Sequence, residues 1–170
     1  PTYNRKTLSK WIELATDKDF GLRKDAIQGL GKIGVPAVPA LTGLLTDEDR
    51  QVQQAAAYAL GQIGPGAKAA VPALAELLKD DKFRWTAIAT LAKIGPEAKA
   101  AVPALAELLK DRQVATSAAL ALGDIGPNAK AAIPALTHLL KDPNAKTRRI
   151  AASSLGQIGP EAKAAVPALV

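Results

Sequence analysis

The stretch GPGAKAAVPALAELLKD at residues 64–80 recurs as GPEAKAAVPALAELLKD at 95–111, identical at 16 of 17 positions. The pattern returns as GPNAKAAIPALTHLLKD at 126–142 and as GPEAKAAVPAL at 159–169. The dipeptide Ile-Gly falls at 33, 63, 94, 125 and 158, a period of 30 to 33 residues that is typical of solenoids. We therefore expect one domain made of repeat units at 1–34, 35–64, 65–95, 96–126 and 127–159, with a sixth unit cut short at 160–170.

Each unit is predicted to hold two helices. Apolar residues recur at helical spacing in the first helix (helix A), as Val71, Leu74 and Leu78 show. Pro72 has no N–H to donate, so helix A should start late or kink there. After a turn at 79–81, the second helix (helix B) carries an apolar stripe, which in the second unit is Val52, Ala56, Leu60 and Ile63.

One glycine per unit stands where helix B should end. A left-handed cap is expected at these glycines, which are Gly34, Gly64, Gly95, Gly126 and Gly159. Neither helix can bury its apolar stripe alone, so the pairs must stack on one another. The predicted fold class is all-α, a right-handed α-solenoid of stacked antiparallel helix pairs.

The composition excludes most catalytic chemistry. The chain has 36 alanines, six aromatic residues, no cysteine and one histidine, His138. A disulfide, a thiolate metal site, a cysteine nucleophile and a multi-histidine metal cage are therefore all excluded by counting. No apolar run approaches the ~20 residues that cross a bilayer. We expect no enzyme activity, no metal or cofactor and no membrane insertion.

The unit, with its VPAL, LLKD and IGP signatures, resembles the short HEAT-like repeats of bacteria that are named after phycobilisome lyases. The resemblance covers nearly the whole chain and implies the fold. It says less of function, because such proteins include bilin lyase subunits, iron-dependent hydroxylases and scaffolds without known activity. The hydroxylases use paired His-Glu motifs, which His138 alone cannot reproduce. A bilin-lyase role would rest on fold alone.

The first and last units depart from the repeat. Trp11 takes the place of Leu74 and its equivalents, so its side chain is expected in the core. The pattern stops within helix A at Val170, and the chain starts without methionine. We interpret it as a segment of a longer protein.

The resemblance also implies a ladder in which an aspartate of the A–B turn pairs with an arginine at the second position of helix B. Arg23, Arg84 and Arg148 hold that position, and the candidate aspartates are Asp17, Asp80 and Asp142. The second and fourth units have Gln53 and Ala115 there instead. The turns before Phe83 and Val114 are also two residues shorter, so this edge should be locally irregular.

Positions 3, 7 and 11, counted from the apolar residue that opens each helix B, share a face opposite the core. In solenoids of this kind helices B line the concave surface, where ligands usually dock. We call these positions the helix-B face; they are Lys24, Gln28, Lys32, Gln54, Tyr58, Gln62, Trp85, Ala89, Lys93, Thr116, Leu120, Asp124, Arg149, Ser153 and Gln157.

The large apolar or aromatic side chains of this face are Tyr58, Trp85 and Leu120, at positions that other units fill with polar groups such as Gln28, Thr116 and Ser153. Aromatic residues beside cations are typical of protein-interface hot spots. We therefore predict an interaction scaffold for a protein or peptide, with an acidic partner favoured. Its predicted binding residues are Tyr58, Trp85, Leu120, Gln54, Gln62, Lys93, Thr116 and Arg149. Trp85 should be more exposed than Trp11.

Three other interpretations stay open. A net charge of +6 suggests nucleic acid, but the five complete units carry +3, −2, +2, −1 and +4, so no unbroken basic stripe tracks a phosphate backbone. The second interpretation is a passive spacer in a larger protein. The third is a designed scaffold, which the near-identity of residues 64–80 and 95–111 would explain. The irregular turns and the distinct first unit favour a natural origin.

Overall fold

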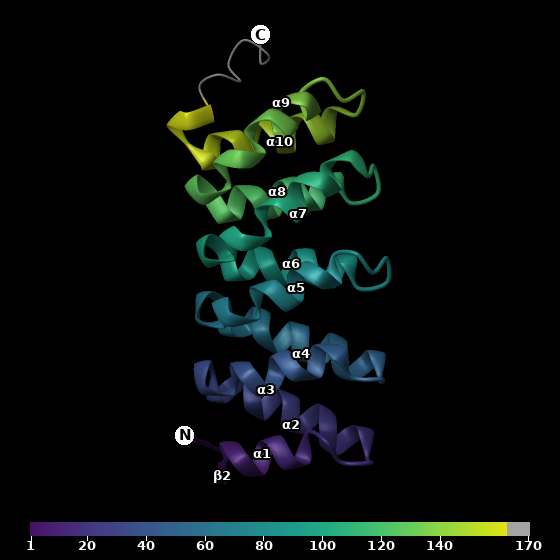
Figure 1. Ribbon diagram of the computed structural model, residues 1–170, viewed down its shortest axis with the longest axis vertical. Coiled ribbons are helices and arrows are strands. Elements are labelled where there is room, and N and C mark those ends of the chain that lie inside the picture. The colour runs from purple at the N-terminus through teal and green to yellow at the C-terminus, as the bar shows by residue number, and fades with distance from the viewer. Residues whose placement is uncertain (163–170) are drawn as a thin grey trace.

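The computed structural model describes residues 1–162, and these form a stack of helix pairs (Figure 1). The α-helices are α1 (Leu8–Leu14), α2 (Phe20–Ile33), α3 (Val38–Gly43), α4 (Arg50–Ile63), α5 (Val71–Leu77), α6 (Arg84–Ile94), α7 (Val102–Glu107), α8 (Ala115–Ile125), α9 (Ile133–Leu139) and α10 (Ala145–Ile158). Odd-numbered helices are the predicted helices A, and even-numbered helices are the predicted helices B. The expected end of the sixth unit at 163–170 lies outside the described residues.

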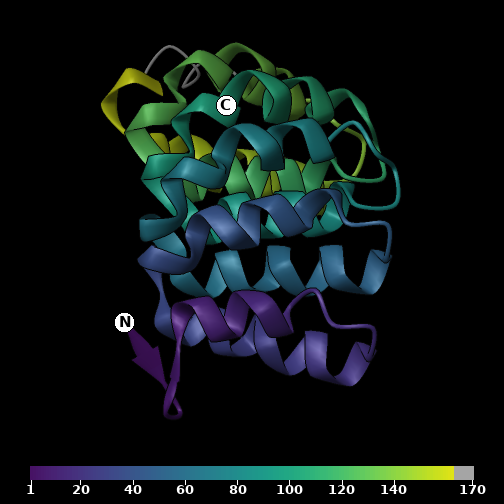
Figure 2. The ribbon, with the colours of Figure 1, turned by 60° about the horizontal axis from the view of Figure 1, so that its bottom comes forward.

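The helices form two rows, and the core lies between them (Figure 2). Each even-numbered helix packs on the even-numbered helices before and after it, and on the odd-numbered helix of its own pair. Leu74 and Leu60 are fully buried, as the apolar stripes predict. The all-α solenoid expected from the period is thus the observed fold. None of the described helices is long and apolar enough to cross a membrane.

Consecutive even-numbered helices approach closely because small residues face each other between them. A Cβ added at Gly31 would lie 3.2 Å from the Cβ of Ala59. One added at Gly61 would lie 3.7 Å from the Cα of Thr90. A third, at Gly123, would lie 3.1 Å from the Cα of Ser154.

Two buried hydroxyls use this close approach to cross between helices. The Ser154 Oγ donates to the Ala119 carbonyl at 2.7 Å, which joins α10 to α8. The Thr90 Oγ1 lies 3.2 Å from the Ala57 carbonyl of α4, and 2.8 Å from the Thr86 carbonyl of its own helix. Both hydroxyls are therefore satisfied without water.

A 3₁₀ turn precedes helix A in the middle of the stack. The 3₁₀ segments are η1 (Val35–Ala37), η3 (Gly64–Ala70), η4 (Gly95–Ala101) and η6 (Gly126–Ala132), with two more, η2 (Leu44–Thr46) and η5 (Leu108–Lys110), ending α3 and α7. Because Pro72 lies in the first turn of α5, where no N–H is needed, α5 begins at Val71 after η3. The late start predicted for helix A is confirmed.

The expected left-handed caps at the helix-ending glycines are wrong in detail. Gly64, Gly95 and Gly126 have positive φ of 65° to 68°, but their ψ lies between −135° and −139°. Left-handed helical geometry needs ψ near +47°. These glycines instead occupy the mirror image of the β region, because the chain must turn at once into a 3₁₀ segment that starts with Gly-Pro.

The A–B turns share one hydrogen-bonding pattern. An aspartate at the end of helix A accepts the N–H two residues further on, as Asp47 does from Asp49 and Asp80 from Lys82. In full-length turns a second polar side chain then caps helix B: Asp19 for α2, Asp49 for α4 and Asn144 for α10.

The predicted irregularity of the two short turns is confirmed. Phe83 and Val114 stand at the N-caps of α6 and α8 and make no side-chain cap. These two helices are 11 residues long, whereas α2, α4 and α10 are 14. A turn shortened by two residues therefore removes the capping side chain and delays the helix.

The predicted aspartates of the ladder are wrong, although arginine rungs exist. Arg23 pairs with Asp49 at 2.6 Å, and Arg84 pairs with Asp111 at 3.1 Å, each in the next repeat. The carboxylates of Asp17, Asp80 and Asp142 accept backbone N–H groups inside their own turns instead.

Two other side chains at the arginine position reach back to the turn before their own helix. Gln53 donates to the Asp47 carbonyl at 2.6 Å, and Arg148 donates to the Asp142 carbonyl at 2.8 Å. Side chains at this position therefore bind either the turn of their own repeat or an aspartate of the next repeat.

A short hairpin precedes the first helix pair. Strands β1 (Thr2–Tyr3) and β2 (Lys6–Thr7) pair in antiparallel fashion, and Asn4 and Arg5 between them have positive φ. The Trp11 indole N–H donates to the Tyr3 carbonyl at 3.1 Å, and the Lys6 ammonium lies 4.8 Å from the Trp11 ring centre. Trp11 is thus buried, as predicted, with its polar edge satisfied by the hairpin.

We predict that Gly95→Ala lowers the free energy of unfolding by about 1–3 kcal/mol, because a side chain strains the backbone at this positive φ. Gly156→Ala is the matched control. It lies inside α10 with nothing within 4 Å of an added Cβ, so it should stabilise the protein by about 0.5–1 kcal/mol. Urea unfolding followed by circular dichroism measures both, and equal midpoints for the two variants would contradict the assignment.

Candidate interaction surface

The helix-B face is exposed as the sequence predicts. All of its side chains are exposed except Thr116, which is half-buried. Its large apolar members are exposed to 61% at Tyr58, 50% at Trp85 and 45% at Leu120. Trp11 is only 6% exposed, so the predicted order of the two tryptophans is confirmed.

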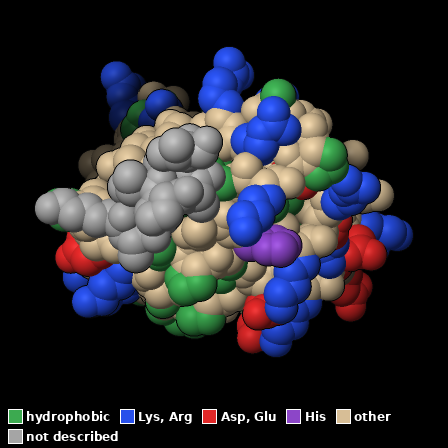
Figure 3. Space-filling view, turned by 90° about the horizontal axis from the view of Figure 1, so that it is seen from above, with side chains coloured by type: hydrophobic (Ala, Val, Ile, Leu, Met, Phe, Trp, Pro, Cys, Tyr) green, Lys and Arg blue, Asp and Glu red, His purple; other side chains and the backbone are tan. Residues whose placement is uncertain are grey.

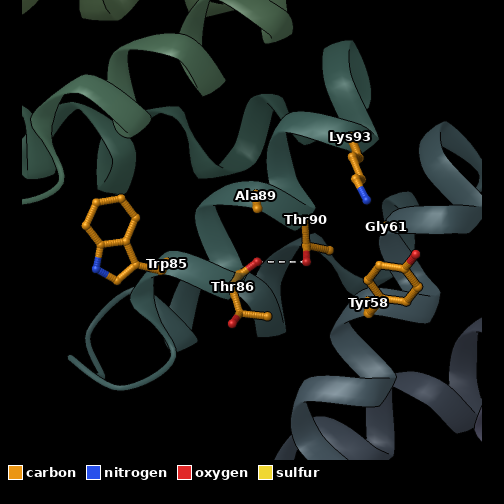
Figure 4. A pocket seen from close by; sticks show the side chains of 7 residues that line it. All are labelled: Tyr58, Gly61, Trp85, Thr86, Ala89, Thr90 and Lys93. Atoms are coloured by element: carbon orange, nitrogen blue, oxygen red, sulfur yellow. Dashed lines mark hydrogen bonds between the residues drawn. The ribbon is translucent and has the colours of Figure 1, made fainter.

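Two neighbouring hollows cut into this face. The smaller, of about 310 Å³, lies between α4 and α6 (Figure 4) and is lined by Tyr58, Gly61, Trp85, Thr86, Ala89, Thr90 and Lys93. In that view Tyr58 and Trp85 stand on opposite sides of Ala89 and Thr86. The larger, of about 1260 Å³, lies between α2 and α4 and also reaches Tyr58. Tyr58 is therefore shared by both hollows.

The two hollows have different chemistry. Small residues form much of the smaller one, because Gly61 and Ala89 leave space beside the two aromatic rings. Polar amides line the larger one, at Gln28, Gln51, Gln54 and Gln62. An exposed amide has donors and an acceptor that suit the backbone of an extended chain.

Cations border both hollows. Lys24 and Lys32 line the larger one, and the Lys93 ammonium lies 4.9 Å from the Tyr58 ring centre. No carboxylate belongs to either lining among the described residues. The one acid of the helix-B face is Asp124 on α8, and partial desolvation raises the pKa of its carboxyl group.

The structure brings together only part of the predicted set. Tyr58, Trp85, Gln54, Gln62 and Lys93 line the hollows. Leu120, Thr116 and Arg149 lie on α8 and α10 and line neither.

Other lining residues lie outside the predicted set, among them Phe20, Gln51, Gly61 and Thr86. A sequence signal was available in the helix-B glycines Gly31 and Gly61, which line the hollows beside exposed side chains of the helix-B face.

Metal-binding side chains do not gather on the described part of the chain. No three His, Asp or Glu side chains of residues 1–162 lie close enough to hold a metal ion. His138 is exposed on α9, and Figure 3 shows the single histidine at the surface beside lysine and arginine side chains.

A family model for HEAT repeats matches residues 8–83, 79–150 and 111–170, which together cover nearly the whole chain. The chain belongs to the HEAT repeat family. No curated protein matches its sequence.

Among solved structures, this HEAT repeat chain is similar to engineered and designed proteins. Two engineered proteins of the Northeast Structural Genomics Consortium are 28% and 27% identical, with TM-scores of 0.64 and 0.68. The alignments cover 95% and 96% of this chain and 83% and 87% of those chains. A designed armadillo repeat protein in complex with the peptide (KR)4 is 20% identical over 89% of this chain and 82% of its own, with a TM-score of 0.68.

We predict that acrylamide quenches the fluorescence of the two tryptophans very differently. In Trp85→Phe only the buried Trp11 emits, so quenching should be weak. Trp11→Phe leaves the exposed Trp85, and quenching should be strong and its emission shifted to the red. Equal Stern–Volmer constants in the two variants would show that Trp85 is covered.

Proposed function

We propose that this HEAT repeat chain is a protein-interaction scaffold that holds a peptide segment of its partner across the helix-B face. The observation that carries the proposal is the pair of adjoining hollows that share Tyr58 and have Trp85 at one end. A groove of about 1260 Å³ exceeds the ~300–1,000 Å³ typical of small-molecule sites, so it suits a chain segment.

Affinity in this proposal comes from the two aromatic rings. Tyr58 and Trp85 keep half or more of their surface in water in the free protein, so a partner has apolar area to bury there. Both belong to the residue types that dominate binding hot spots. The glutamine amides of the larger hollow would then bond the partner's backbone, which fixes its direction.

Charge selects an acidic partner. Lys24, Lys32 and Lys93 border the hollows, and no carboxylate lines them among the described residues. Acidic side chains would therefore speed association and favour the correct partner over basic ones. Thr116, Leu120 and Arg149 would extend the same surface toward the C-terminal end of the stack.

A further observation supports the proposal. The designed armadillo repeat protein of similar fold was solved with the peptide (KR)4, so a stack of helical repeats can hold a peptide. We also propose, from the VPAL, LLKD and IGP signatures, that the repeats are of the short bacterial HEAT-like type.

Selection from a random peptide library tests the proposed function. Selected peptides should be rich in Asp or Glu beside apolar residues. Tyr58→Ala and Trp85→Ala should each weaken their binding by about 2 kcal/mol, roughly thirtyfold in Kd by calorimetry.

Val35→Ala is the matched control, since Val35 is 59% exposed and lines neither hollow. It should leave affinity unchanged, while all three variants keep the wild-type melting temperature. If no peptide is selected, or if Val35→Ala weakens binding as much as Tyr58→Ala, the alternative of a passive spacer holds instead.

A further inference from the structure

The arginine rung between the third and fourth repeats shows what fills the edge of the stack. Arg84 lies at the start of α6, and its Nε donates to the Leu78 carbonyl at 3.0 Å. Its Nη1 donates to the Asp111 Oδ2 of the next repeat at 3.1 Å. Its Nη2 pairs with Asp81 Oδ1 of its own turn at 2.5 Å. The guanidinium thus joins two repeats through one carbonyl and two carboxylates.

One repeat later, the carbonyl and the inter-repeat aspartate recur, whereas the arginine does not and Arg112 replaces Asp81. The residues 31 positions after Leu78, Arg84 and Asp111 are Leu109, Ala115 and Asp142. These three residues line one hollow of about 520 Å³ between the fourth and fifth repeats. The methyl group of Ala115 stands where Arg84 has its long side chain, so the hollow occupies the place of a missing arginine.

Two acceptors of the rung, equivalent to the Leu78 carbonyl and to Asp111, remain in this hollow as Leu109 and Asp142. Asp142 Oδ1 accepts the Asn144 N–H at 2.8 Å, as Asp111 Oδ1 accepts that of Gln113 at 2.9 Å. The second oxygen of Asp142, equivalent to the one that binds Arg84, receives no hydrogen bond from residues 1–162.

The rung between the first two repeats points to the same place. There Arg23 binds Asp49, the side chain that caps α4. Asn144 caps α10 in the same way and also lines the hollow. Carbonyl, carboxylate and amide oxygens are therefore gathered where both kinds of rung would end.

The walls suit an arginine side chain in shape. Leu109, Ala115, Ala135 and Leu139 supply apolar surface for a methylene stem. Of the cations at the rim, Lys110 is bound by Glu107 at 2.6 Å, which leaves Arg112 and His138 as the other basic side chains there.

We infer that this hollow, lined by Leu109, Ala115, Asp142 and Asn144, binds the guanidinium of an arginine side chain supplied by a partner protein. The incoming arginine completes the rung that Ala115 leaves empty, with charge-assisted hydrogen bonds to Asp142. The hollow lies at the edge of the A–B turns, away from Tyr58 and Trp85, so it does not depend on the proposed peptide groove.

A titration with N-acetyl-arginine methylamide, followed by amide chemical shifts in ¹⁵N-labelled protein, tests the site. Shifts should be confined to residues 109–115 and 138–147. N-acetyl-lysine methylamide should bind more weakly, because an ammonium lacks the planar fork. Asp142→Asn should weaken the arginine response about tenfold or more.

Two variants of the rung itself are the decisive controls. Ala115→Arg fills the hollow from within, so it should abolish the response while the melting temperature stays equal or rises. Arg84→Ala empties the neighbouring rung, so it should create a second set of shifts around residues 78–84 and Asp111.

Three results would overturn the inference. One is the absence of localised shifts in the wild-type protein. Another is an unchanged response in both Ala115→Arg and Asp142→Asn. The third is a stronger localised response to inorganic phosphate than to the arginine probe, since this would make the rim cations Arg112 and His138 an anion site.

Discussion

The close packing of consecutive even-numbered helices is the constraint on which the rest of the structure depends. Gly31 against Ala59, Gly61 against Thr90 and Gly123 against Ser154 keep neighbouring helices in backbone contact. Larger residues at these points would separate the helices, lengthen the distance between repeats and break the hydroxyl bond from Ser154 to Ala119. The same spacing aligns exposed positions of successive helices, which is why Tyr58 of α4 and side chains of α6 line one hollow.

Polar contacts at the turn edge adjust this packing repeat by repeat. Arg23 and Arg84 make ion pairs that are partly shielded from solvent, with about a fifth of each arginine side chain exposed. Gln53 replaces the ion pair by a bond within its own repeat, and Ala115 replaces it by empty space. The second position of helix B thus carries an inter-repeat ion pair, a hydrogen bond within its own repeat, or neither. No single one of these contacts is needed at every repeat to hold the stack together. Residues at this position can therefore vary to suit a binding partner.

The period and the apolar stripes predicted the helix pairs, the buried Trp11 and the exposed helix-B face, because burial in a solenoid follows directly from repeat position. Repeat position does not predict which of several nearby groups a polar side chain binds. The Asp–Arg ladder was predicted at Asp17, Asp80 and Asp142. These carboxylates instead accept N–H groups of their own turns, which lie closer to them than any arginine does. Left-handed caps were predicted at the glycines, because the spacing of apolar residues does not indicate that a 3₁₀ segment begins at Gly-Pro. The hollows depend on the small size of Gly61 and Ala115, and a search for apolar stripes and motifs does not register a side chain that is small or missing.

The near-identity of residues 64–80 and 95–111 also has a consequence for how the chain reaches its fold. Because each segment has nearly the sequence of the other, we expect α7 to compete with α5 for a place against α6 during folding. Helices B resolve the competition, because α6 and α8 differ in sequence while the segments before them do not. The correct order of repeats in the folded chain therefore depends on the differences between α6 and α8, and not on α5 and α7, which are nearly identical.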